Sequence, residues 1–403
     1  MEHSHGAHGA AIRNPGTFEV SQKIKTVFLV FAALGAVSFL VSLRMDPSRA
    51  WASFVINHFY FMCLGLGGIF FAVLQWVTGA MWSAPVRRLS EAFSAYLPVV
   101  AITFAILYFG IPHLYIWSHP EHVQGDLVLM GKSGYLSVPF FLIRNFIAIG
   151  IWVFFAKKMV GNSVAQDVDR ENHKYTLKNR TLGPIFLALF GVSFTMASFD
   201  QLMSLDPHWF STMFGVYCFA GLFYANLASV CLLALYLKSK GKLEGILNEN
   251  HLHDLGKFML AFAVFWAYIA FSQFMLIWYA NLPEETGYFI TRMHGQWLWV
   301  SLFLLVGKFV LPFVILLPRD AKRNPKILAG VGIFMLFAQW IDILWMVQPE
   351  FFKEGPILGL TELGVTLGFL GIFGLCVAKF LAKNNVVAIG DPRLAESVFH
   401  HHQ

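Results

Sequence analysis

The sequence predicts an all-α polytopic membrane protein with ten transmembrane helices. Of its 403 residues, 57% are hydrophobic and only 13% are charged, which is about half the charged share of a soluble domain. The apolar residues come in runs of roughly 20 or more, the length that spans a bilayer core. We expect helices, because barrel strands would be half as long and would alternate in polarity.

The ten apolar runs divide the chain into two polar tails and one membrane domain. Residues 1–23 are expected to form a flexible tail; its three histidines could bind a metal, but a plain tail is favoured. The membrane domain is expected over 24–383 and a second tail over 384–403. The spans are predicted at 24–43, 50–78, 87–112, 135–158, 181–203, 208–237, 256–280, 294–317, 327–348 and 356–381.

The two halves of the membrane domain are loosely alike. Spans two to five and spans six to nine are each expected to form a four-helix bundle, with spans one and ten at the periphery. No clean sequence repeat supports this division, so it depends on the number and length of the spans.

The distribution of Lys and Arg predicts the orientation of the chain. Both tails and the loops that follow even-numbered spans hold 22 of the 29 Lys and Arg residues, whereas the other loops hold 5. Because positively charged loops stay in the cytoplasm, both termini are expected to be cytoplasmic. This distribution also explains the net charge of +6, so a nucleic-acid partner is not expected.

The four cysteines all lie inside apolar runs, and none forms a CxxC or CxxCH pair. The sequence therefore predicts no c-type haem attachment, no cysteine-held metal or iron–sulfur cluster, and no covalently bound cofactor. A b-type haem would need paired axial histidines, and His58 has no such partner at matching depth.

Ionisable residues inside the predicted spans are few. Such groups are costly in hydrocarbon and commonly mark function, although an interhelical salt bridge or a snorkelling side chain is the structural alternative. We expect them to form part of a proton-conducting path that includes Arg144, Lys308, Asp342 and Glu362.

Other polar side chains gather near the predicted outer ends of the helices. Quinol oxidation needs such groups, because a headgroup hydroxyl must hydrogen-bond to an acceptor that then takes its proton. The 42 Phe residues would line an apolar vestibule for an isoprenoid tail. A lone membrane histidine is more often a packing residue than a ligand. The candidate quinone-binding residues are His58, His113, Asp200, Asp206, His208 and Gln273.

Four stretches resemble a known family: SFDQLMSLDPHWFSTMFGVYCFAG at 198–221, FSQFMLIWYANLPEETGYF at 271–289, RMHGQWLW at 292–299 and DPRLAES at 391–397. They are similar to the NrfD-like membrane subunits of bacterial alternative complex III, especially the shorter, ActF-type subunit (quinone-binding subunit 2 of the quinol:cytochrome c oxidoreductase). The NrfD/polysulfide-reductase membrane subunit family is similar more distantly. The resemblance covers nearly the whole chain.

The resemblance implies a multi-pass subunit of the bacterial inner membrane in a complex that oxidises menaquinol or another quinol. It implies two four-helix bundles with two flanking helices. The haems and iron–sulfur clusters would belong to partners: a multihaem cytochrome c, a monohaem cytochrome c, an iron–sulfur/molybdopterin-like subunit and a sister ActC-type subunit. The sister is usually given the main quinol site, and an adjoining terminal oxidase is a further partner. Lys308 stands where a histidine is expected in relatives.

Three functions are compatible with these features. The favoured one is a subunit, not catalytic alone, that contributes a quinone-like pocket or a proton path and docks periplasmic redox subunits. A purely structural membrane anchor is the second. A secondary transporter is the third; against it, no corresponding pair of spans shows the Gly/Pro-broken helices of a midplane site.

Overall fold

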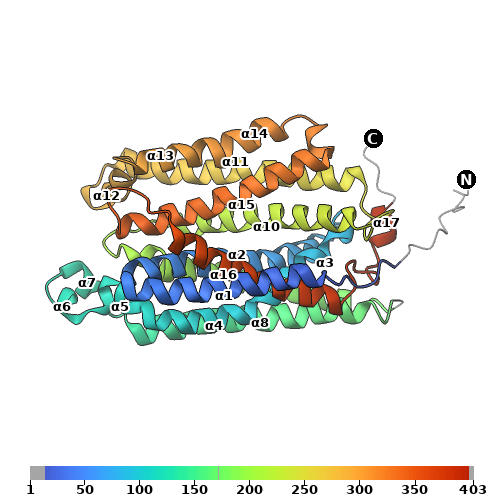
Figure 1. The fold of residues 1–403 in the computed structure, drawn as a ribbon, viewed down its shortest axis with the longest axis horizontal. Helices are drawn as coiled ribbons and strands as arrows, with labels where there is room; N and C mark the ends of the chain where they lie inside the picture. Colours follow the sequence, from blue (N-terminus) through green and yellow to red (C-terminus); the bar gives the residue numbers. More distant parts are fainter. Residues whose placement is uncertain (1–13, 171, 399–403) are drawn as a thin grey trace, which may run out of the picture.

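The computed structural model describes residues 14–170 and 172–398, and the three N-terminal histidines lie outside this part. Ten helices in it are long and apolar enough to cross a membrane, which confirms the predicted class. They run side by side along the long axis of the molecule (Figure 1). We call the end where α1 begins and α16 ends the tail end, and the opposite end, with α5–α7 and α12, the loop end.

The elements follow one another with short connections. Four spans are interrupted or extended by short 3-10 or π-helical segments, including a π-helical segment at Leu304–Val310 between α13 and α14. The membrane helices are α1 (Gln22–Met45), α2 (Pro47–Thr78), α3–α4–α5 (Ala84–Phe93, Leu97–Leu107, Ile111–Leu114), α8 (Val138–Gln166), α9 (Lys174–Gln201), α10 (Phe214–Ser239), α11 (Glu249–Ala280), α13 and α14 (Trp297–Phe303, Leu311–Leu316), α15 (Pro325–Val347) and α16 (Leu360–Lys383). The short helices outside them are α6 (Pro120–Val123), α7 (Leu127–Lys132), α12 (Pro283–Arg292) and α17 (Leu394–Val398).

The membrane helices form two four-helix bundles. The first contains α2, α3–α4, α8 and α9, and the second contains α10, α11, α13–α14 and α15. The first helix of each bundle, α2 or α10, is the most deeply buried, and these two helices pack against each other at the centre of the molecule. Helices α1 and α16 pack along each other at the periphery, as expected.

Local sequence signals explain where the helices start and stop. Asp46 alone separates α1 from α2; its side chain accepts the Arg49 N–H, and Pro47 occupies the first position of α2, where a missing N–H costs nothing. Gly79 ends α2 in the left-handed conformation at φ 65°, which glycine adopts without strain.

Small residues allow α1 and α16 to approach closely. A Cβ added to Gly35 would lie 2.2 Å from Gly368 Cα, so the backbones touch at this point. Close packing of small residues is a common way for helices to associate in lipid, where no hydrophobic force drives them together.

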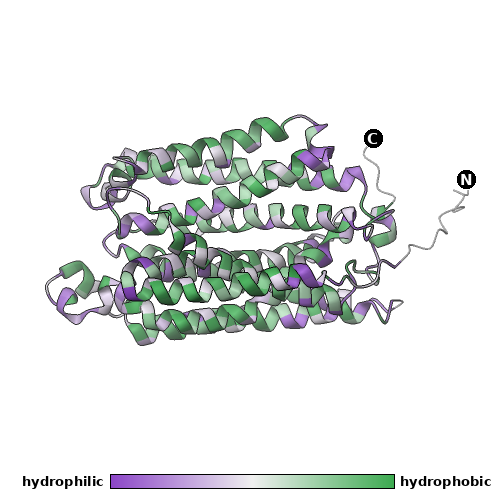
Figure 2. Ribbon diagram, in the orientation of Figure 1, coloured by the Kyte–Doolittle hydropathy of each residue, from purple (hydrophilic) through white to green (hydrophobic). Residues whose placement is uncertain are grey.

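Hydrophobic residues cover the shafts of the long helices, and hydrophilic residues concentrate at both ends (Figure 2). The predicted spans agree with the helices to within a few residues at most ends, with four larger differences. Helix α8 ends at Gln166 rather than 158, and α11 begins at Glu249 rather than 256, because polar turns extend both helices at the tail end. Helix α9 begins at Lys174 rather than 181, because its first turns are polar and extend beyond the hydrocarbon. Helix α10 begins at Phe214 rather than 208, because 206–213 forms turns around Pro207.

Candidate functional site

The first bundle holds a buried ion pair near the loop end. Arg144 lies in the second turn of α8 and Asp200 in the last turn of α9. The guanidinium Nε and Nη2 donate to the two carboxylate oxygens of Asp200 over 3.0 and 2.8 Å. Asn145 Nδ2 adds a third hydrogen bond to Asp200 over 3.0 Å. Asp200 is only 1% exposed, so the pair compensates a charge that would otherwise be very costly in hydrocarbon.

Aromatic rings fix the outer side of Arg144. Its guanidinium lies 3.7 Å from the ring centroid of Tyr135 and 4.3 Å from that of Phe140, and it donates to the Tyr135 carbonyl over 2.8 Å. Burial, followed by the negative charge of Asp200, raises the pKa of the Tyr135 hydroxyl to about 12. This hydroxyl therefore stays protonated at neutral pH beside the ion pair.

A groove between α8 and α9 leads from the lipid-facing surface to this pair. Its volume is about 220 Å³, below the roughly 300–1,000 Å³ of a pocket that encloses a drug-sized ligand. Ile147 and Val192 on its walls are 58% and 65% exposed, so it opens toward the bilayer. The groove is lined by Arg144, Asn145, Ile147, Ala148, Ile151, Leu189, Val192, Ser193, Met196, Ala197 and Asp200.

The second bundle holds its own buried ion pair. Lys308 Nζ lies 2.5 Å from Asp342 Oδ2, and the Tyr217 hydroxyl donates to Asp342 Oδ1. Neither charged side chain is more than 1% exposed. The ammonium also faces the ring of Trp266 at 4.3 Å and that of Tyr224 at 5.3 Å, which is the geometry of a cation–π contact.

The backbone around Lys308 is irregular for an identifiable reason. Pro312 has no N–H to give to the carbonyl four residues earlier, which is that of Lys308. The chain is π-helical over this stretch, and the Tyr224 hydroxyl donates to the Lys308 carbonyl over 3.2 Å. A neighbouring helix thus satisfies the freed backbone group, as lipid requires. Segments of this kind often occur at functional sites.

The two ion pairs occupy equivalent positions in the two bundles. In each, the cation lies on the third helix and the carboxylate on the fourth. The segments FDQLMSLDPHWF at 199–210 and IDILWMVQPEFF at 341–352 align without a gap, which matches Asp200 to Asp342 and Pro207 to Pro349. Sequence reasoning missed this short repeat, although an aspartate seven residues before a proline at the end of both spans is a readable signal.

Apart from the His208 N–H, which donates to Asp206, no hydrogen bond joins the predicted quinone-binding residues to one another within the described part of the chain. The His58 ring is fully buried, with Nδ1 2.8 Å from Thr103 Oγ1. Gln273 is also buried. Their Nε2 atoms have no hydrogen-bond partner within the described residues, and neither side chain hydrogen-bonds to Asp200 or Asp342 there. The described hydrogen bonds therefore divide these side chains among different helices and separate contacts, and their joint role in quinone binding stays a prediction.

The remaining outer residues belong to the surface of the loop end. His113 is exposed and Asp206 half-buried. The exposed His208 pairs with Asp126 of the 113–134 loop, and this hydrogen bond lowers the pKa of Asp126 below its usual value. A groove of about 440 Å³ lies here; its ionisable lining residues are His113, His119, His122, Asp206, His208, Glu350 and Lys353.

Glu362 stands apart from the other residues of the predicted proton path. Its carboxylate takes two hydrogen bonds from Arg49 over 2.8 and 2.7 Å and one from the Gly359 N–H over 2.8 Å. It thus caps the start of α16 and ties that helix to α2. Among the described residues, Glu362 has no hydrogen bond or ion pair with Lys308 or Asp342, so the structure places the predicted path in separate groups.

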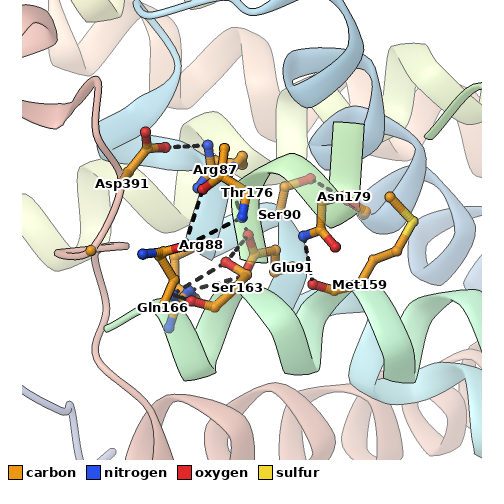
Figure 3. A network of polar contacts seen from close by, with 12 residues as sticks. Arg87, Arg88, Ser90, Glu91, Met159, Ser163, Gln166, Thr176, Asn179 and Asp391 are labelled. Atoms are coloured by element: carbon orange, nitrogen blue, oxygen red, sulfur yellow. Dashed lines mark hydrogen bonds and ion pairs between the residues drawn. The ribbon is translucent and has the colours of Figure 1, made fainter. Parts of the chain in front are cut away.

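A second ionic network, which sequence reasoning missed, lies at the tail end (Figure 3). The fully buried Arg88 of α3 pairs with Glu91 one turn later and with Asp167 after α8, both over 2.9 Å. Arg87 pairs with Asp391 of the C-terminal segment. The network joins the third and fourth spans and gives a structural reason for the stretch DPRLAES. In the sequence this network is indicated only by two adjacent arginines followed by a glutamate, a pattern that is also typical of a charged loop.

Within the part of the chain that the structure describes, no three His, Cys, Asp or Glu side chains are arranged to hold a metal ion. No protein-family model matches the chain, and no curated protein matches it. Assignment to the NrfD-like subunits therefore rests on the motifs quoted above.

Proposed function

We propose that the chain is the NrfD-like membrane subunit of a respiratory quinol:electron-acceptor oxidoreductase of the alternative complex III type, in a bacterial inner membrane. The observation that carries this proposal is the lipid-facing groove that ends at the Arg144–Asp200 pair. An apolar channel open to the bilayer, closed by a hydrogen-bonding charged pair, is what a lipid-soluble molecule with a polar headgroup requires.

The residues of the groove fit a quinol headgroup. Asp200 Oδ1 takes one hydrogen bond from Arg144, and a carboxylate oxygen can accept a second. A headgroup hydroxyl could therefore donate to this atom, and Asn145 and Ser193 add polar groups to the lining. A bound quinol would supply two electrons and two protons. Asp200 would accept the two protons one after the other, each leaving toward the loop end before the next arrives, and Arg144 would keep the carboxylate oriented.

The electrons would leave through redox centres of partner subunits, which the motifs imply to be haem and iron–sulfur proteins. The Lys308–Asp342 pair, with the Tyr217 hydroxyl on the same carboxylate, would exchange protons within the second bundle. Buried acid–base pairs joined by a hydroxyl are common parts of proton relays in membranes. The grooved loop end, rich in histidines and acids, would face the periplasmic partners.

The experiment is quinol-driven reduction of the acceptor by the purified complex with Asp200→Asn. Loss of a proton acceptor lowers the rate by about 100-fold or more, and the amide keeps the shape of the side chain. Glu121→Gln changes an exposed acid at the same end and serves as the matched control, with no expected effect. Co-purification of the haem-bearing partners shows that both variants assemble.

A structural anchor is the alternative that one observation favours: Asp200 and Asp342 are each already paired with a buried cation. An anchor predicts that Asp200→Asn weakens the assembled protein but leaves turnover per assembled complex unchanged. That result would contradict the proposed function.

A further inference from the structure

A further groove lies at the tail end, away from both ion pairs of the bundles. Its volume is about 660 Å³, and it runs between α8 and α16 along the start of α4. Its walls are mostly apolar and include Leu97, Pro98, Val160 and Phe380. Three lysines, Lys157, Lys379 and Lys383, also line it.

The three lysines are all positively charged, and no nearby carboxylate in the described part of the chain neutralises them. Each side chain is exposed, and no carboxylate of the described residues lies within 4.0 Å of any of the three ammonium groups. Lys157 comes from α8, whereas Lys379 and Lys383 lie one turn apart on α16. Two helices far apart in sequence thus bring like charges to the rim of one apolar groove.

We propose that this groove binds an anionic phospholipid, with the phosphate on the three lysines and acyl-chain segments along the apolar walls. The apolar walls of the groove match the acyl chains of a phospholipid, and the lysines at its rim match the negative charge of the headgroup. Clusters of basic residues at the end of membrane helices attract anionic headgroups, and basic pockets between helices select them. A neutral lipid would leave the lysines unpaired, and a free phosphate would leave the apolar walls empty.

One glycine provides a way to fill the groove without disturbing the helices. Gly161 lines it, and a Cβ added there would meet no atom within 4 Å. Gly161→Phe therefore places a ring in the groove from the wall of α8. Lys158 is the natural charge control, because it is exposed and adjacent to Lys157 but does not line the groove.

The experiment measures lipid binding to the purified full chain by native mass spectrometry and thermal stabilisation. The probes are phosphatidylglycerol, phosphatidylcholine with the same acyl chains, and inorganic phosphate. The variants are Lys157→Gln/Lys379→Gln/Lys383→Gln, Gly161→Phe, and the charge-matched control Lys23→Gln/Lys158→Gln/Lys326→Gln. We expect phosphatidylglycerol to bind best, and its affinity to fall by roughly 5-fold for each groove lysine removed, about 100-fold in all.

Gly161→Phe should abolish the same binding while the control triple keeps it to within a few-fold. Three results would overturn the proposal: equal binding of phosphatidylcholine, equal stabilisation by inorganic phosphate, or equal losses in the groove and control triples. Because neither the groove lysines nor Gly161 lies in the quinol groove, the outcome is independent of the proposed function.

Discussion

At the scale of residues, the central feature is that each bundle holds a buried pair of opposite charges. Arg144 and Lys308 each pair with one carboxylate, and that carboxylate also accepts a hydrogen bond from Asn145 or Tyr217. A buried pair adds little net stability over an apolar pair of the same volume, but removal of one partner leaves a charge without compensation. Retention of two such pairs is better explained by function than by stability.

A double-mutant cycle at the second pair tests this energetic reasoning. Lys308→Met leaves the buried Asp342 carboxylate without a counter-charge and should destabilise the protein by about 3–5 kcal/mol. The double variant Lys308→Met/Asp342→Leu removes both charges and should recover most of that loss. Thermal unfolding of the purified protein in detergent measures both changes. Equal destabilisation by the single and double variants would show that packing, not charge, dominates this site.

The Asp126–His208 contact gives a pH dependence at the loop end. The hydrogen bond from His208 lowers the pKa of Asp126, so its contribution is fully present above the ordinary aspartate pKa of about 3.9. It is lost as the pH falls through the lower pKa of the folded protein. Hydrogen exchange of the 126–132 segment should therefore stay slow down to below pH 4 and then rise. His208→Ala should shift that rise to higher pH; an unchanged profile would contradict the pairing.

The sequence was enough to predict which charged residues lie within the membrane spans. It was not enough to predict which of them form ion pairs. Pairing depends on the rotation of each helix about its axis and on the packing of neighbours, and neither is visible in a run of apolar residues. His58 and Gln273 looked equivalent to Asp200 by depth alone, yet they lie in separate contacts. The short repeat around Asp200 and Asp342 would have indicated that each bundle holds an equivalent site.

At the scale of elements, helix length and termini follow from the sequence because hydrocarbon thickness and capping residues determine them. Irregular segments do not. The π-helical stretch at Leu304–Val310 depends on Pro312 together with the Tyr224 hydroxyl from another helix. Residues 208–213 of the turn region were predicted as the beginning of a helix, because Trp209 and Phe210 are apolar enough to continue one.

Close packing of α1 on α16 can be tested with glycine substitutions. At Gly35 a Cβ would overlap Gly368, so Gly35→Leu should force the two helices apart and destabilise the protein by about 1–3 kcal/mol. Gly191→Leu is the matched control, because a Cβ at that position meets no atom within 4 Å. Thermal unfolding of the two variants provides the comparison. Equal stability would contradict the close contact of α1 with α16.

At the scale of the whole molecule, the helices of both bundles run along the long axis (Figure 1), and the flanking helices α1 and α16 pack against each other and against α2. The Lys and Arg distribution predicts that the tail end is cytoplasmic. Cysteine replacements at Lys23 and Lys326, at the tail end, should react with membrane-impermeant maleimide only after the membrane is opened. Replacements at Glu121 and Glu285, at the loop end, should react in intact cells. The reverse pattern would place the candidate sites on the other side.

The quinol groove can be tested most directly with a photoreactive quinone analogue on the intact complex, followed by peptide mapping. Label is expected on α8 and α9 near Ile147 and Val192. Val192→Trp, which fills the groove, should remove it, whereas Ile333→Trp, at an equally exposed position of α15, should not. Label confined to other helices or other subunits, or label that survives Val192→Trp, would contradict quinol binding beside Arg144 and Asp200.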